Sequence, residues 1–138
     1  VFVGDSKEWI DELASQFGQI RPGAWNDPDA AYGPQISPAA KQRVLKMIEQ
    51  GKQEGATCLL DGSDCTVEGL PDGNWVGPTL FTDVTANMAI YQEEIFGPVL
   101  CCVCVDSRLG LLVGQFVGQL KFGLLAVVAD TGGDPAVE

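Results

Sequence analysis

Residues 99–105 form an almost unbroken apolar run that follows directly on Gly97-Pro98. A short continuous run of this kind is typical of a strand buried on both faces of a parallel sheet. The strands and helices expected before it alternate along the chain. The sequence therefore predicts an α/β fold, a mostly parallel sheet with flanking helices.

A helix is predicted after the short strand that ends at Gly4. Asp5 or Ser6 can cap its first turn, and Gly18 can end it. Four large apolar side chains recur at helical spacing along one face of this segment: Trp9, Ile10, Leu13 and Phe17.

A second helix is predicted from Ser37-Pro38, after a loop at residues 21–38 rich in Pro and Gly. Serine is a preferred N-cap, and proline is tolerated in the first helical turn. Gly51 or Gly55 ends the helix. The remaining elements are a short buried strand at residues 56–60, an extended segment at 75–84 and a helical turn at 86–91. Trp9, Trp25 and Trp75 are expected to be packing residues.

Composition and charge exclude two classes of partner. The chain has 138 residues, 46% of them hydrophobic and 20% charged, which suits one globular domain. Its net charge of −11 argues against nucleic acid and against an anionic membrane surface. Lys121 and several glycines interrupt the apolar residues 109–128, so no membrane span is predicted.

The five cysteines predict neither a disulfide framework nor a metal site. Strand alternation places Cys102 and Cys104 on one face and Cys101 on the other. A Cys-x-Cys pair can ligate a metal, but the chain has no histidine and no second pair at suitable spacing. Small buried apolar side chains are the simpler interpretation, and free thiols suit a reducing compartment.

The residues before the apolar run carry the most specific motif: Tyr91-Gln92-Glu93-Glu94-Ile95-Phe96-Gly97-Pro98. It resembles the Glu-Glu-Ile-Phe-Gly-Pro signature of the aldehyde dehydrogenase superfamily. Two further segments resemble that family in the same order: Gly33-Pro34-Gln35-Ile36-Ser37 with the helix after it, and Gly77-Pro78-Thr79-Leu80-Phe81-Thr82-Asp83-Val84. Within the superfamily, Leu59-Leu60-Asp61-Gly62 and Gly73-Asn74-Trp75-Val76-Gly77-Pro78-Thr79 look most like methylmalonate-semialdehyde dehydrogenases.

This resemblance implies a chemistry. Such enzymes oxidise malonate and methylmalonate semialdehydes with NAD and coenzyme A, in valine catabolism, and form acetyl-CoA or propionyl-CoA through a cysteine thioester. It also implies a small-molecule aldehyde substrate, homo-oligomers, and a location in the bacterial cytoplasm or the mitochondrial matrix.

The resemblance gives cofactor-binding roles to Glu94 and Phe96. Glu94 matches the family carboxylate that accepts hydrogen bonds from the nicotinamide ribose hydroxyls, and Phe96 matches the aromatic residue near the nicotinamide. From the residues alone, Glu93-Glu94 would be a solvated helix end and Phe96 a core residue, and Glu93 stays ambiguous. Arg21 and Arg43 are expected at the surface, with a carboxylate or phosphate of the substrate or coenzyme A as the alternative partner.

No catalytic residue is assigned. In the family, the nucleophilic cysteine lies a few residues before the strand that matches Val1-Phe2-Val3, and none of the five cysteines matches its motif. Val1 lies inside an apolar run without an initiator methionine. We therefore expect an internal fragment that is inactive alone. Alternatives are a fragment of an ordinary NAD-dependent aldehyde dehydrogenase, or a non-catalytic product that associates with intact subunits.

The resemblance is expected to stop near Asp106. Residues 1–106 are predicted to form a partial catalytic domain, and residues 107–138 a non-matching Gly- and Leu-rich tail, frame-shifted or disordered. Within that tail, Gly110, Gly114 and Gly118 have the spacing of small residues that pack helices together, but the glycines disfavour a helix.

Overall fold

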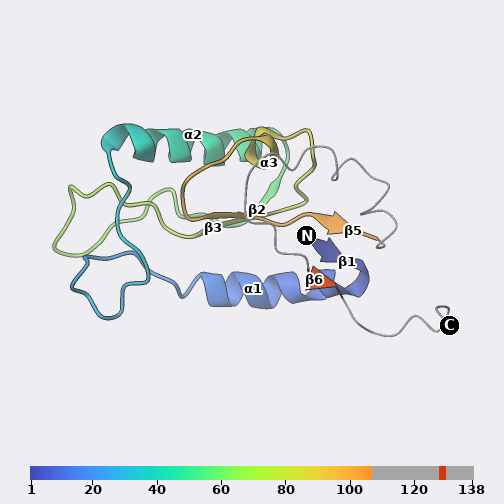
Figure 1. The fold of residues 1–138 in the computed structure, drawn as a ribbon, viewed down its shortest axis with the longest axis horizontal. Helices are drawn as coiled ribbons and strands as arrows, with labels where there is room; N and C mark the ends of the chain where they lie inside the picture. The colour runs from blue at the N-terminus through green and yellow to red at the C-terminus, as the bar shows by residue number, and fades with distance from the viewer. Residues whose placement is uncertain (107–127, 130–138) are drawn as a thin grey trace.

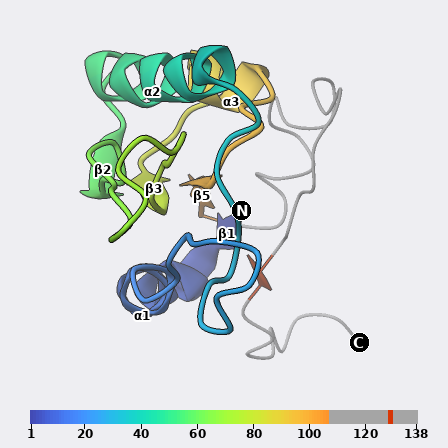
Figure 2. The ribbon, with the colours of Figure 1, turned by 90° about the vertical axis from the view of Figure 1, so that its left-hand side faces the viewer.

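The computed structural model describes residues 1–106 and 128–129. Helices cover both sides of the strands (Figure 1), and the end-on view shows the same three layers (Figure 2). Helices α2 (Pro38–Gln53) and α3 (Ala89–Gln92) lie on one side, and the 3-10 helix η1 (Gly4–Trp9) with α1 (Ile10–Phe17) lies on the other. The strands are short: β1 (Phe2–Val3), β2 (Thr57–Leu60), β3 (Thr79–Thr82), β4 (Val99–Cys101), β5 (Cys104–Val105) and β6 (Val128–Ala129).

The strands form two three-stranded sheets, in the orders β5-β1-β6 and β2-β3-β4. Among the described strands, three of the four pairings are parallel, and only β2 with β3 is antiparallel. The predicted α/β class with a mostly parallel sheet is confirmed. The predicted tail lies outside the described residues, apart from β6, which pairs with β1.

The apolar run at residues 99–105 is not one fully buried strand, and that prediction was wrong. The chain leaves one sheet and enters the other between Cys102 and Val103. The Cys102 amide donates to the Phe81 carbonyl at 2.7 Å, whereas the Val103 carbonyl accepts from the Phe2 amide at 2.8 Å. Because β4 and β5 are both edge strands, Leu100 and Cys104 are exposed.

This break also changes the cysteine prediction. Alternation along a strand is not maintained across Cys102 and Val103, since those residues belong to no strand. Cys102 is buried and Cys104 is exposed, so the two do not share one environment.

Helix α2 forms as its sequence signals predict. The Ser37 hydroxyl accepts from the Ala40 amide at 3.1 Å, and Pro38 is the first helical residue. The helix ends at Gln53, and Gly55 adopts a φ of +96°, a left-handed conformation that glycine adopts without steric cost. The buried face of α2 includes Val44, Met47 and Ile48. These side chains pack against Phe81 of β3 and the residues around α3.

The first helix is less regular than predicted. Ser6 does not cap it, because its hydroxyl accepts from the Val3 amide and donates to the Val3 carbonyl, both at 2.9 Å. The chain therefore makes a 3-10 turn before α1 begins. Ile10 of α1 packs with Phe2 and Leu80 in a second apolar cluster, on the side of β3 opposite to Phe81.

Two other expectations were wrong. Strand β2 alternates between exposed and half-buried, rather than buried, because it forms the edge of its sheet. Trp75 is buried, but Trp9 is half exposed and Trp25 is 97% exposed, so Trp25 is no packing residue. No helix among the described residues is long and apolar enough to cross a bilayer.

Candidate functional site

The motif at residues 93–98 forms a loop that joins α3 to β4. Its start is fixed where the Glu93 amide donates to the Ala89 carbonyl at 2.9 Å and ends α3. Its end is fixed where the Pro98 carbonyl accepts from the Thr79 amide at 2.9 Å, in register with β3. Between these points Ile95 is buried in the larger apolar cluster. The loop is therefore a defined element and not a free connection.

Phe96 has an unusual backbone. Its φ is +54°, the left-handed region, which costs a residue with a Cβ about 1–2 kcal/mol. Its side chain is 70% exposed, so the interpretation of Phe96 as a core residue was wrong. Strained backbone of this kind clusters at functional sites.

Gly97 is required by close packing against α2. A Cβ built at Gly97 would lie 2.8 Å from Val44 Cγ1 and 2.9 Å from Val44 Cγ2. The glycine of the motif thus lets the loop lie directly on the helix, and no left-handed conformation is involved.

Arg43 of α2 contacts the loop through its guanidinium group. Its guanidinium donates to the Glu94 carbonyl at 2.9 Å and to the Ile95 carbonyl, and it lies 5.4 Å from the centroid of the Phe96 ring. Arg43 is at the surface as expected, but sequence reasoning missed this role. Positions 43 and 94 are 51 residues apart, and no local pattern connects them.

The two motif carboxylates are exposed. Within residues 1–106 the Glu94 side chain makes no ion pair or hydrogen bond with the protein, although its own carbonyl is bound by Arg43. Glu94 and Phe96 are therefore both exposed, two residues apart on this loop. The structure brings these two predicted residues together on one loop.

None of the five thiols has the lowered pKa of an activated nucleophile. Burial, with a smaller contribution from Cys102, raises the pKa of Cys101 to about 12, and burial raises the pKa of Cys102 to about 11. Burial likewise raises the pKa of the other three thiols, Cys58, Cys65 and Cys104. Reactive cysteines need the opposite shift. Among the described residues, no group of three or more potential ligands could hold a metal ion.

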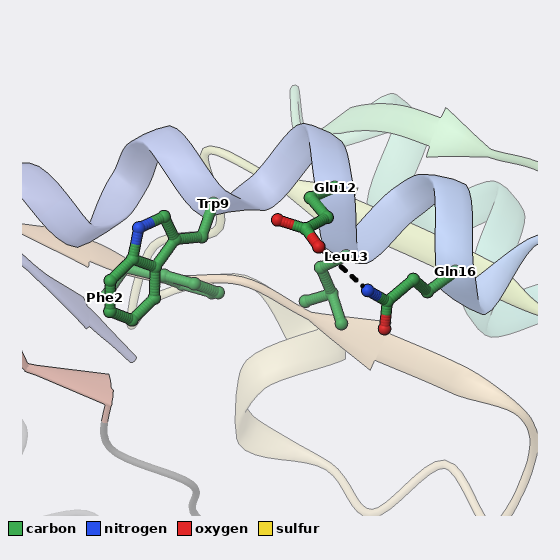
Figure 3. A pocket seen from close by; sticks show the side chains of 5 residues that line it. All are labelled: Phe2, Trp9, Glu12, Leu13 and Gln16. Atoms are coloured by element: carbon green, nitrogen blue, oxygen red, sulfur yellow. Dashed lines mark hydrogen bonds between the residues drawn. The ribbon is translucent and has the colours of Figure 1, made fainter.

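A pocket of about 240 Å³ lies along η1 and α1. Figure 3 shows the side chains that line it: Phe2, Trp9, Glu12, Leu13 and Gln16. The Gln16 side chain donates to the Glu12 carboxylate at 3.0 Å. The pocket is mainly apolar and lies on the opposite layer from the motif loop.

Comparison with known proteins identifies the class. The family model described as "Aldehyde dehydrogenase family" matches residues 2–129, and the chain belongs to this family. The matched range extends beyond Ser107, and the division of the chain at Asp106 stays a prediction.

Within that family the chain is similar to methylmalonate-semialdehyde dehydrogenases. It is 48% identical over 136 residues to the human enzyme named methylmalonate-semialdehyde/malonate-semialdehyde dehydrogenase [acylating], mitochondrial, covering 99% of this chain and 25% of that one. The solved structure of methylmalonate-semialdehyde dehydrogenase from Oceanimonas doudoroffii has a TM-score of 0.75 and 33% identity, and covers 80% of this chain and 23% of its own.

A second solved structure is a putative methylmalonate-semialdehyde dehydrogenase from Sinorhizobium meliloti complexed with NAD. Its TM-score is 0.74 and its identity 30%, covering 91% of this chain and 30% of its own. The chain thus spans about a quarter of the length of the relatives it matches.

Proposed function

We propose that this chain is part of an NAD-dependent, CoA-acylating methylmalonate- or malonate-semialdehyde dehydrogenase and supplies the loop that contacts the nicotinamide end of the cofactor. The observation that carries the proposal is the pairing, on one fixed loop, of the exposed Glu94 carboxylate with the exposed Phe96 ring. The similarity to named semialdehyde dehydrogenases supports the substrate class.

The loop has the chemistry that a nicotinamide riboside needs. A carboxylate accepts hydrogen bonds from two ribose hydroxyls, and charge-assisted bonds of this kind are about twice as strong as neutral ones. The Phe96 ring offers an apolar surface to an aromatic group. NAD, when bound, supplies the acceptor for hydride, and Glu94 and Phe96 orient it.

Coenzyme A and the mitochondrial matrix belong to the same proposal. The word "acylating" in the human relative's name supports transfer of the acyl group to coenzyme A, and "mitochondrial" supports the location. The raised pKa values of the five thiols in this chain support a thioester-forming cysteine elsewhere in the proposed enzyme. Homo-oligomers are expected for the complete enzyme.

The experiment uses a hybrid enzyme in which residues 1–106 replace the matching segment of the human relative. Changing Glu94 to Gln keeps the side-chain size and removes the charge. Each charged hydrogen bond contributes about 1.5–3 kcal/mol, so KM for NAD should rise about tenfold or more. Steady-state kinetics with malonate semialdehyde, NAD and coenzyme A measure this.

Glu93→Gln is the matched control, because Glu93 is also exposed and is adjacent but ends α3 through its backbone. It should leave KM for NAD within about twofold, as surface changes usually do. If Glu93→Gln raised KM and Glu94→Gln did not, the cofactor role would belong to Glu93 instead.

A further inference from the structure

We propose that Arg43 is a positioning residue that fixes the direction in which Glu94 and Phe96 face the cofactor. The inference rests on the proposed function for its consequence in catalysis. It concerns a residue outside the motif, held on a different element of the fold. Its basis is the set of three contacts that one guanidinium makes with three consecutive loop residues.

The base of this arrangement is rigid. Arg43 lies in the second turn of α2, which is capped by Ser37 and anchored in the core through Val44, Met47 and Ile48. A side chain that extends from such a helix starts from a fixed point. The neighbouring Val44 packs against the loop at Gly97, so two successive residues of α2 contact the loop.

The two hydrogen bonds determine the path of the loop backbone. They fix the directions of the Glu94 and Ile95 carbonyls and therefore the planes of the two peptide groups before Phe96. With those planes fixed, Phe96 is held in its left-handed conformation, which a free loop would leave. The Glu94 side chain is carried on the same fixed backbone.

The third contact concerns the Phe96 ring itself. The guanidinium carbon lies 5.4 Å from the ring centroid, within the range of a cation–π interaction. A planar guanidinium can donate along its edge to two carbonyls while its face meets a ring. The ammonium group of lysine has no such plane, so it can make only some of the three contacts.

Two variants test the geometry in the 138-residue chain itself. Arg43→Met removes all three contacts, whereas Lys46→Met removes an equal charge from an exposed residue of the same helix that makes no bond within residues 1–106. Hydrogen exchange of the Glu93 and Val99 amides, which donate to the Ala89 and Gly97 carbonyls at the two ends of the loop, should accelerate about tenfold or more in Arg43→Met and stay unchanged in Lys46→Met. Equal exchange in both variants would overturn the proposal, and so would loss of protection throughout α2.

Kinetics in the hybrid enzyme then test the consequence. Arg43→Met should raise KM for NAD roughly tenfold while kcat and KM for the aldehyde change much less. Arg43→Lys should recover part of the affinity, because it keeps the charge and one donor. A general loss of folding would lower activity at all substrates and would not be recovered by lysine, which would contradict a positioning role.

The two proposals fail separately. If Glu94→Gln leaves KM for NAD unchanged, the cofactor role of the loop is wrong, whatever Arg43 does to hydrogen exchange. If Glu94→Gln raises KM but Arg43→Met alters neither exchange nor KM, the cofactor role stands and the positioning role of Arg43 is wrong.

Discussion

Cys101 shows how burial sets the chemistry of a side chain. Its thiol donates to the Ile90 carbonyl at 3.6 Å, and burial followed by the adjacent Cys102 raises its pKa to about 12. The folded chain therefore favours the protonated thiol over the thiolate. As pH rises above the ordinary thiol value of 9.0, the unfolded chain loses this proton first, so the contribution of Cys101 to stability is lost progressively up to about pH 12.

We expect Cys101 to be alkylated at least about tenfold more slowly than the exposed Cys104 at pH 8, because only the thiolate reacts. Iodoacetamide labelling followed by peptide mass spectrometry measures both rates in one sample. In urea the two rates should converge. Equal rates in the folded chain would show that Cys101 is not protected.

For single residues of the candidate site, the sequence prediction and the structure agree at some positions and differ at others. Glu94 is exposed, as a solvated helix end predicts, and the resemblance adds only its role. The exposure of Phe96 could not be predicted from its apolar character, because a left-handed backbone and an arginine above its ring keep it exposed. The contacts of Arg43 with the loop could not be predicted, since its partners lie in a segment distant along the chain.

Among the elements, the contact of α2 with the motif loop depends on Gly97. Gly97→Ala should destabilise the chain by about 1–3 kcal/mol, because the new methyl group would overlap the Val44 methyl groups. Gly33→Ala is the matched control: a Cβ there meets nothing within 4 Å. Urea unfolding followed by circular dichroism gives both free energies.

A double variant separates steric overlap from other effects of the alanine. With Val44→Ala present, Gly97→Ala should cost much less, because the overlapping methyl groups are gone. If the cost of Gly97→Ala were the same in both backgrounds, the glycine would be needed for another reason.

Local signals predicted the elements well where the signal and its partner are neighbours in sequence. Ser37-Pro38 begins α2 as expected, and Gly18 follows the end of α1, because caps involve only residues within one turn. The run at residues 99–105 was mispredicted because its burial depends on which strands lie beside it. Only the fold places β3 beside β4 and β1 beside β5.

For the whole molecule, we expect no NADH production by the 138-residue chain supplied with malonate semialdehyde and coenzyme A. In its proposed role, Glu94 makes one charged contact to NAD, worth about 1.5–3 kcal/mol, while even millimolar affinity requires about 4 kcal/mol. NAD should therefore bind more weakly than about 1 mM. Calorimetric titration and absorbance at the NADH band check both statements, and detectable turnover would contradict them.

The pairing of β1 has a consequence for how the chain folds during its synthesis. In the described part of the protein, β1 pairs only with β5 and β6, which come from the opposite end of the chain. At about 5–20 residues per second, β5 leaves the ribosome on the order of ten seconds after β1. For that interval β1 lacks the two partners that it has among the described residues, and an unpaired strand edge is a recognised route to aggregation. Helix α2, by contrast, has its cap and its whole apolar face in one local segment and can form first.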